Sequence, residues 1–185
     1  MSDAERLSEI ETDTWNLLGR AVVDKRSPLR WFTLATVSSD GQPEARTVVL
    51  REIDRDARRI MLFTDRRAAK VAALQANPKA ECHFLDSRKM LQFRLSGVAE
   101  ILTRGARWQG LFDKVPDYGL GDYSALIAPG TSGKMDSDSA LAADHFTVID
   151  ISIESLDWLS LSRQGHQRAR FVWQDEKRQA EFVVP

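Results

Sequence analysis

The feature that most constrains the fold of this chain is a series of short, strand-like runs separated by strong turn signals. Residues 31–38 are apolar and β-branched, Asp40-Gly41 is typical of a hairpin turn, and residues 44–53 are again rich in valine and threonine. Tight turns of this kind join antiparallel neighbours, because a parallel pair needs a long crossover between its strands. Further strands are expected over residues 59–64, 80–85, 89–102, 145–153, 158–161, 169–173 and 180–184.

Helices are expected over residues 3–25, 66–75 and 103–112. The first has apolar side chains at helical spacing, and Pro28 ends it. Asp65 is expected to cap the second helix, which Asn77-Pro78 stops, and Thr103 is expected to cap the third. Short antiparallel strands with inserted helices are typical of a β-barrel with peripheral helices, not of a parallel α/β sheet. No Gly-x-Gly-x-x-Gly follows a strand, so a dinucleotide-binding fold has no support.

The length of the chain is that of one domain, so we expect residues 1–185 to form a single unit. Within it, residues 1–28 make up the N-terminal helical segment. Residues 113–144 form an irregular region rich in Ser and Asp, with several Gly and two Pro. A loop of that length is usually functional or mobile.

Composition excludes several classes of protein. The net charge of -1 argues against a nucleic-acid partner that is bound through general basicity. No apolar run approaches the roughly 18 residues of a membrane-spanning helix, and the charged N-terminus lacks the apolar core of a signal peptide. The single cysteine, Cys82, excludes an intramolecular disulfide and fits a reducing compartment, so we expect a cytoplasmic protein.

The segment from Arg46 to Arg51 carries a cation at each end of a strand. Because side chains alternate along a strand, the two arginines lie on opposite faces. The plainer interpretation is a pair of solvent-exposed arginines. The alternative is that one arginine binds a phosphate through its planar guanidinium, while the backbone between the two hydrogen-bonds a flat heterocycle. The residues between them are Thr47, Val48, Val49 and Leu50.

A second basic segment follows the strand over residues 59–64. Thr64 lies at the strand end, just before a helix start, where free N–H groups and the helix dipole favour an anion. Arg67 and Lys70 are three residues apart and share one face of a helix. On its own this pattern is typical of a solvated basic helix face. Combined with Arg46 it indicates a phosphate site.

Gln92 lies in an otherwise apolar strand, where a buried amide needs hydrogen-bond partners. It is either an exposed edge-strand residue or a group that binds the polar edge of a ring. The histidines are His83, His145 and His166, and none has metal-ligand spacing with another histidine, a cysteine or a carboxylate, so we expect no metal. The sequence also lacks a nucleophile elbow and a P-loop, so it identifies no catalytic residue.

Together these residues resemble the pyridoxamine 5′-phosphate oxidase-like flavoproteins, the FMN-binding split-barrel family. In that family a strand motif Arg-Met-Val-Leu-Leu-Lys is followed by Tyr-Thr, a helix start with Arg-Lys, and a strand Gln. Here these positions read Arg46-Thr47-Val48-Val49-Leu50-Arg51, Phe63-Thr64, Ala69-Lys70 and Gln92, and the match extends over residues 30–102. The resemblance implies an antiparallel split β-barrel with peripheral helices, and FMN at the interface of a homodimer. The implied cofactor-binding residues are Arg46, Thr47, Val48, Val49, Leu50, Arg51, Phe63, Thr64, Arg67, Lys70, Gln92 and Arg170.

The resemblance is weaker on the substrate side. The family binds a substrate phosphate through a Lys at the end of the first motif, where this chain has Arg51, and through Tyr, Arg and Ser on a helix without a clear counterpart here. Asp113 and Asp117 would repel a phosphate in that region. The implied substrate-binding residues are Arg51, His166 and Arg168.

The function implied by the resemblance is that of an FMN-binding oxidoreductase, in which the flavin mediates the redox chemistry of an unidentified small molecule. Oxidation of pyridoxamine or pyridoxine 5′-phosphate is not favoured, because the phosphate ligands are missing. Two alternatives stay open: an NAD(P)H-dependent reductase of flavin or another small molecule, and a flavin-binding protein without catalysis. We expect neither a nucleic acid nor a membrane as partner.

Overall fold

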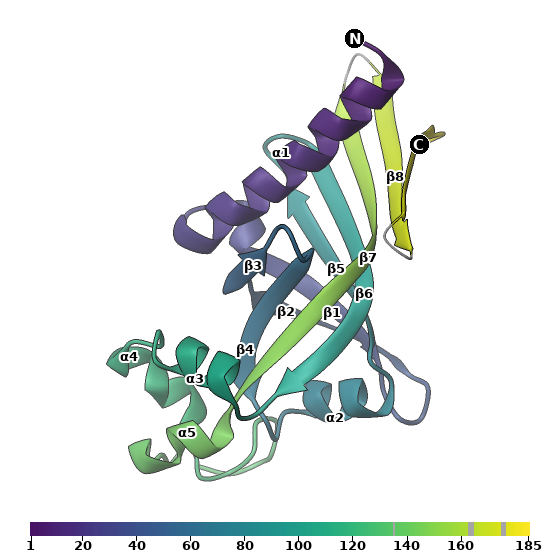
Figure 1. Ribbon diagram of the computed structural model, residues 1–185. Coiled ribbons are helices and arrows are strands. Elements are labelled where there is room, and N and C mark those ends of the chain that lie inside the picture. Colours follow the sequence, from purple (N-terminus) through teal and green to yellow (C-terminus); the bar gives the residue numbers. More distant parts are fainter. Residues whose placement is uncertain (135, 163–164, 175–176) are drawn as a thin grey trace.

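The computed structural model describes residues 1–134, 136–162, 165–174 and 177–185. Its strands are β1 (Trp31–Val37), β2 (Pro43–Val49), β3 (Glu52–Asp54), β4 (Arg59–Asp65), β5 (Lys79–Asp86), β6 (Leu91–Leu102), β7 (Phe146–Ser162), β8 (Gly165–Gln174) and β9 (Lys177–Val183). In the described part of the chain they form one antiparallel sheet in the order β2-β1-β5-β6-β7-β4-β3, with β8 paired to β7 and β9 to β8 (Figure 1). The expected antiparallel, mainly β fold is therefore confirmed.

Helices lie around this sheet rather than within it (Figure 1). They are α1 (Asp3–Val23), α2 (Ala69–Ala76), α3 (Ala106–Phe112), α4 (Asp117–Leu120) and α5 (Ala142–His145), with the 3₁₀ turns η1 (Pro28–Arg30), η2 (Gly121–Tyr123) and η3 (Ser139–Leu141). A capping box of Ser2 and Glu5 begins α1, which buries Leu7, Trp15 and Leu18 in the main core. Among the described residues, no helix combines the length and the hydrophobicity that crossing a membrane requires.

The β1–β2 hairpin forms where the sequence predicts it. Gly41 takes a φ of 84°, a conformation that favours glycine, and the amide of Ser38 donates to the carbonyl of Gln42 at 2.9 Å. The two strands then pair in register as far as Trp31 and Val49. This register places Val49 on the same face of the sheet as Trp31.

β7 is the longest strand, and it pairs with β4, β6 and β8 along its length. The prediction of separate strands at 145–153 and 158–161 is wrong, because the residues between them stay paired with β6 across a register shift at Ser96 and Gly97. Gly97 allows the close approach, since a Cβ there would lie 2.1 Å from the carbonyl oxygen of Ser152. One bent strand therefore replaces two.

The second and third helices begin later than predicted. Asp65 is the last residue of β4 rather than an N-cap, and its carboxylate accepts the amide of Arg67 at 2.8 Å, so that α2 begins only at Ala69. Thr103 does not cap α3, which instead follows Gly105 at a φ of 97° without any side-chain cap. In both cases the chain turns once more before the helix starts.

The strand predicted over 44–53 is interrupted after β2. The amide of Leu50 donates to the carbonyl of Arg30 at 2.8 Å, and the amide of Arg51 donates to the carbonyl of Met61 at 2.9 Å. The chain thus leaves β1 and joins β4 as β3. Arg51 lies at this crossing between two parts of the barrel.

The region expected to be irregular, 113–144, contains α4, part of α5, and η2 and η3, so it is more ordered than predicted. An aromatic cluster centred on Phe146 holds it against β4 and the start of β7. The rings of Phe63, Trp108, Phe112 and Tyr123 lie 5.0–5.8 Å from that of Phe146, centroid to centroid. This cluster positions Tyr123 next to the site described below.

Candidate functional site

A cavity of about 270 Å³ lies where the end of β2, the end of β4 and the start of α2 meet. Part of its wall comes from the 113–144 region, through Asp122, Tyr123 and Pro129. Among the residues expected to bind a cofactor, those that line it are Thr47, Val48, Val49, Arg51, Phe63, Thr64 and Lys70. The fold therefore brings residues of β2, β4 and α2 together with Arg51 and with part of the 113–144 region.

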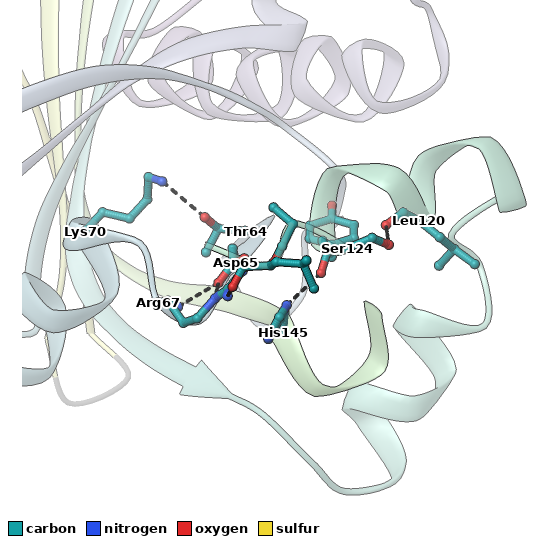
Figure 2. A network of polar contacts seen from close by, with 10 residues as sticks. Thr64, Asp65, Arg67, Lys70, Leu120, Ser124 and His145 are labelled. Carbon is teal, nitrogen blue, oxygen red and sulfur yellow. Dashed lines mark hydrogen bonds and ion pairs between the residues drawn. The ribbon is translucent and has the colours of Figure 1, made fainter. Parts of the chain in front are cut away.

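One end of this cavity carries the groups suited to an anion. The ammonium Nζ of Lys70 donates to the hydroxyl Oγ1 of Thr64 at 3.1 Å (Figure 2), and Thr64 is itself buried. Burial lowers the pKa of Lys70 below its ordinary value, and the positive charge of Arg46 lowers it further, against the opposing effect of Asp65. Lys70 lies in the first turn of α2, where backbone N–H groups lack helical partners. A charged lysine held in this way is stabilised by a bound anion.

Arg46 lies behind the cavity and does not line it. It pairs with Leu34 of the neighbouring strand β1 and lies on the core-facing side of β2. Its Nη1 donates to the hydroxyl of Thr36 at 2.7 Å, and its Nη2 forms an ion pair with Glu44 at 2.6 Å. Its charge is nevertheless close enough to Lys70 to lower the pKa of that residue.

Arg67 is occupied by contacts within the protein. Its guanidinium binds both carboxylate oxygens of Asp65 and donates to the carbonyls of Ala125 and Leu126 at 2.8 and 3.2 Å. Burial opposes ionisation of Asp65, but the hydrogen bonds and charge of Arg67 outweigh it and hold the pKa of that carboxyl below its ordinary value. Figure 2 shows this network beside His145, whose Nδ1 lies 3.0 Å from the carbonyl oxygen of Tyr123. Arg67 thus fastens the 113–144 region to the corner between β4 and α2.

Tyr123 is one of the cavity residues that the sequence analysis missed. It is only 4% exposed, yet it lines the cavity beside Arg51 and Phe63. Burial raises the pKa of its phenol to about 12, although the charge of Arg51 opposes that rise. No sequence signal marks this residue, because its place depends on the fold of a region without regular periodicity. The hydroxyl keeps its proton at neutral pH and is available as a hydrogen-bond donor.

Leu50 contributes less than the motif suggests. Its side chain is fully buried in the core, and its amide is already bonded to the carbonyl of Arg30. Arg51 is placed differently: its guanidinium carbon lies 5.8 Å from the centroid of the Phe63 ring. Among the described residues no carboxylate forms an ion pair with Arg51.

The remaining predicted residues lie elsewhere on the same face of the sheet. Gln92 and Arg168 both stand opposite Leu159 of β7, and neither lines the cavity. Arg168 binds both carboxylate oxygens of Asp157, at 2.9 and 2.7 Å. Burial of Asp157 opposes its ionisation, but the hydrogen bonds from Arg168 and Arg94 lower the pKa of that carboxyl below its ordinary value. His166 and Arg170 are exposed.

The strand registers connect the two groups of predicted residues. One continuous row of cross-strand partners runs from Thr47 to Arg170 through Thr33, His83, Arg94 and Asp157. Partners in such a row point to the same side of the sheet. Five strand spacings of about 4.8 Å separate its ends, a distance of roughly 24 Å along the sheet. Within a single chain, Thr47 and Arg170 therefore lie far apart on one face of the sheet.

The residues that the structure describes offer no group of three or more His, Cys, Asp or Glu side chains able to hold a metal ion. The site chemistry is that of cations, hydroxyls and aromatic rings.

Comparison with known proteins agrees with this architecture. Residues 12–103 match the family model described as pyridoxamine 5′-phosphate oxidase, FMN-binding domain. A pyridoxine/pyridoxamine 5′-phosphate oxidase of Microcystis aeruginosa is 41% identical over 117 residues, which cover 63% of this chain and 54% of that protein. The protein of the same name from Alteromonas mediterranea is 32% identical over 94 residues, covering 51% and 43%. The chain thus spans about half the length of the curated relatives it matches.

Solved structures show the same fold at low sequence identity. A pyridoxamine 5′-phosphate oxidase-related, FMN-binding protein from Nostoc punctiforme superposes with a TM-score of 0.78 at 22% identity, over 94% of this chain and 96% of that one. PhzG from Burkholderia lata, solved with tetrahydrophenazine-1-carboxylic acid, gives a TM-score of 0.73 at 18% identity, over 94% and 91%. The family match, together with this shared fold, shows that the chain belongs to the pyridoxamine 5′-phosphate oxidase-like family of FMN-binding split-barrel proteins.

Proposed function

We propose that this protein is an FMN-dependent oxidoreductase that acts on a small molecule as a homodimer. The observation that carries the proposal is a single cavity that joins anion-binding groups, Thr64 and Lys70, to a flat apolar wall formed by β2 and Phe63. FMN has this combination of parts: a phosphate at one end and a planar ring system at the other. The residues present therefore fit the cofactor that the family model names.

At the phosphate end, we assign as ligands the side chains of Lys70 and Thr64 and the amides of Ala69 and Lys70, since the amide of Val71 already donates to the carbonyl of Ala68. Arg46 contributes through its charge from behind β2, and its contact with Glu44 must loosen for it to bind the phosphate directly. Arg67 acts indirectly, since it holds the 113–144 wall in place. A phosphate at this corner also offsets the repulsion between Lys70 and Arg46.

At the ring end, Thr47 and Val49 form one wall of the cavity, and Phe63 and Tyr123 form another. Bound flavin supplies the hydride and electron chemistry, which needs no protein nucleophile. The protein's part is to hold the ring in position, to exclude water with the aromatic wall, and to offer the protonated Tyr123 hydroxyl as a donor. Arg51 provides a positive charge beside the ring.

Two observations support a homodimer. The cavity of about 270 Å³ lies just under the roughly 300 Å³ at which small-molecule sites begin, so one chain would enclose FMN only in part. Apolar side chains are also exposed on the face of the sheet that carries both groups of predicted residues, with Trp31 57% and Leu85 48% exposed. A second copy packed on this face about a twofold axis would bring Gln92, Arg168 and Arg170 of the partner subunit toward the cavity.

The test is a titration of the flavin-free protein with FMN, followed by tryptophan fluorescence, for the wild type and for an Arg46→Ala/Lys70→Ala double variant. We expect saturable binding of one FMN per chain in the wild type and a loss of affinity of at least about 100-fold in the variant. Equal affinity of the two proteins would refute the assignment of the phosphate end.

A further inference from the structure

A second, larger cavity of about 520 Å³ adjoins the first one. The two cavities share Arg51, Phe63, Asp122 and Tyr123 as common walls. The far side of the larger cavity is formed by η1, β3 and the segment that leads into α4. Its volume is within the range of small-molecule sites. A ring bound in this cavity would lie directly beside a ring bound in the first.

The charges around the larger cavity leave one positive charge in excess. Arg30 and Arg51 form no ion pair with a carboxylate in the described ranges. The guanidinium Nη1 of Arg30 donates to the carbonyl of Val22 at 2.5 Å. Lys114 is neutralised by Glu52 at 3.0 Å. Asp122 lines the cavity without a described cation as partner. Two cations and one carboxylate that lack an ion-pair partner among the described residues therefore suit a ligand that carries a single negative charge.

Apolar side chains line another part of the larger cavity. Phe63 contributes an aromatic ring, Val115 and Pro116 contribute aliphatic surface, and Tyr118, which is 82% exposed, stands at the rim. The lining of the larger cavity contains no Ser or Thr hydroxyl that could bind a phosphate. The helix beside it, α4, has only four residues and so offers no phosphate site at its start. The groups that suit a phosphate, Thr64 and Lys70 at the start of α2, belong to the other cavity. The two cavities thus differ in the anion that each is built to hold.

We propose that the larger cavity is the substrate pocket and that it selects a flat, unsaturated ring bearing one carboxylate. Arg30 and Arg51 bind the carboxylate, and Asp122 disfavours ligands with a second negative charge, such as a phosphate monoester. The Tyr123 hydroxyl, at the wall between the cavities, is positioned to donate a hydrogen bond to the ring. This inference rests on the proposed function, because it places the substrate against the flavin cavity.

The test compares 2-naphthoate with 2-naphthyl phosphate as ligands of the FMN-loaded protein at pH 8, where a phosphate monoester is a dianion. Binding is followed through the change that each ligand causes in the flavin absorption spectrum. We expect 2-naphthoate to bind about tenfold more tightly than the phosphate, a difference of about 1.4 kcal/mol. Asp122→Asn, at an exposed position, should reduce that preference to about twofold or less.

Two further variants test the cation assignment. Arg30→Gln should weaken 2-naphthoate binding at least about tenfold, which is the scale of a charge-assisted hydrogen bond. Because Arg30 also contacts the end of α1, the thermal midpoint and retained FMN establish that this variant is folded. Arg104→Gln removes the same charge at an exposed position outside the cavity, and it should leave the affinity within twofold.

The outcomes separate this inference from the proposed function. Retained FMN without a spectral response to either ligand would overturn the substrate pocket and leave the cofactor assignment standing. Equal or tighter binding of 2-naphthyl phosphate in the wild type would overturn the charge selection. A protein that retains no FMN would overturn the proposed function and this inference with it.

Discussion

Substitution of Lys70 by methionine separates the stability of the protein from its binding of FMN. The side chain of Lys70 is half-buried and lies near the charge of Arg46. Its ammonium donates a hydrogen bond to the hydroxyl of Thr64. Methionine keeps the length of the side chain and removes the charge. Without FMN, the loss of a hydrogen bond is offset by the relief of desolvation and repulsion, so the free energy of unfolding should stay within about 1 kcal/mol of the wild type.

FMN binding should respond much more strongly to the same change. A charge-assisted hydrogen bond to a phosphate contributes roughly 1.5–3 kcal/mol, which corresponds to an increase in Kd of about 10- to 150-fold. The assay pairs urea unfolding of the flavin-free protein with an FMN titration. Lys79→Met, at an exposed position at the start of β5, is the matched control and should change neither quantity. A Kd within twofold of the wild type would show that Lys70 is not a phosphate ligand. A loss of stability above about 2 kcal/mol would show that the ammonium stabilises the flavin-free fold.

The pH dependence of binding follows from the same residue. The pKa of Lys70 is lowered in the flavin-free fold, so the ammonium loses its proton at a lower pH than an exposed lysine would. FMN affinity should therefore fall as the pH rises through that lowered pKa. The fall should begin below about pH 10.4, which is the ordinary pKa of a lysine. The Lys70→Met variant should not show this fall.

Three further predictions concern the frame around the site. Gly97→Ala places a Cβ 2.1 Å from the carbonyl oxygen of Ser152, so it should lower the free energy of unfolding in urea by at least about 2 kcal/mol. An unchanged midpoint would contradict the close approach of β6 and β7. Arg67→Met leaves the buried carboxylate of Asp65 unpaired and should cost about 2–3 kcal/mol, part of which Asp65→Asn in the same chain should restore. The pKa values of Asp65 and Asp157 are lowered in the fold, so both carboxylates stabilise the protein above about pH 4–5. That stabilisation is lost as the pH falls through the folded-state pKa values. Urea midpoints at pH 6 and pH 3.5 measure the loss, and equal midpoints would contradict it.

Local signals predicted much of the fold. The Asp40-Gly41 turn predicted the β1–β2 hairpin, and Asn77-Pro78 predicted the end of α2. These features depend on a few adjacent residues, whose backbone preferences are strong. Starts of helices were harder to predict, because Asp65 uses its carboxylate for the amide and guanidinium of Arg67 instead of capping a helix.

Features that depend on distant partners could not be read in this way. The continuity of β7 depends on its pairing with β6 across Gly97, which no local pattern encodes. Tyr123 reaches the cavity because Phe146 and Arg67 fix the region that carries it. The same limit applies to Gln92, which shares a motif with the cavity residues in sequence but lies outside the cavity in a single chain.

We propose that FMN binds where two copies of this chain meet. The mass and flavin content of the protein after loading with FMN and gel filtration test that proposal. Light scattering gives the mass of the eluted species, and the flavin absorption band gives its cofactor content. We expect a species of two chains that carries two FMN molecules, and we expect the flavin to be released when the dimer dissociates into single chains. A single chain that retains FMN in a one-to-one complex would contradict the proposal.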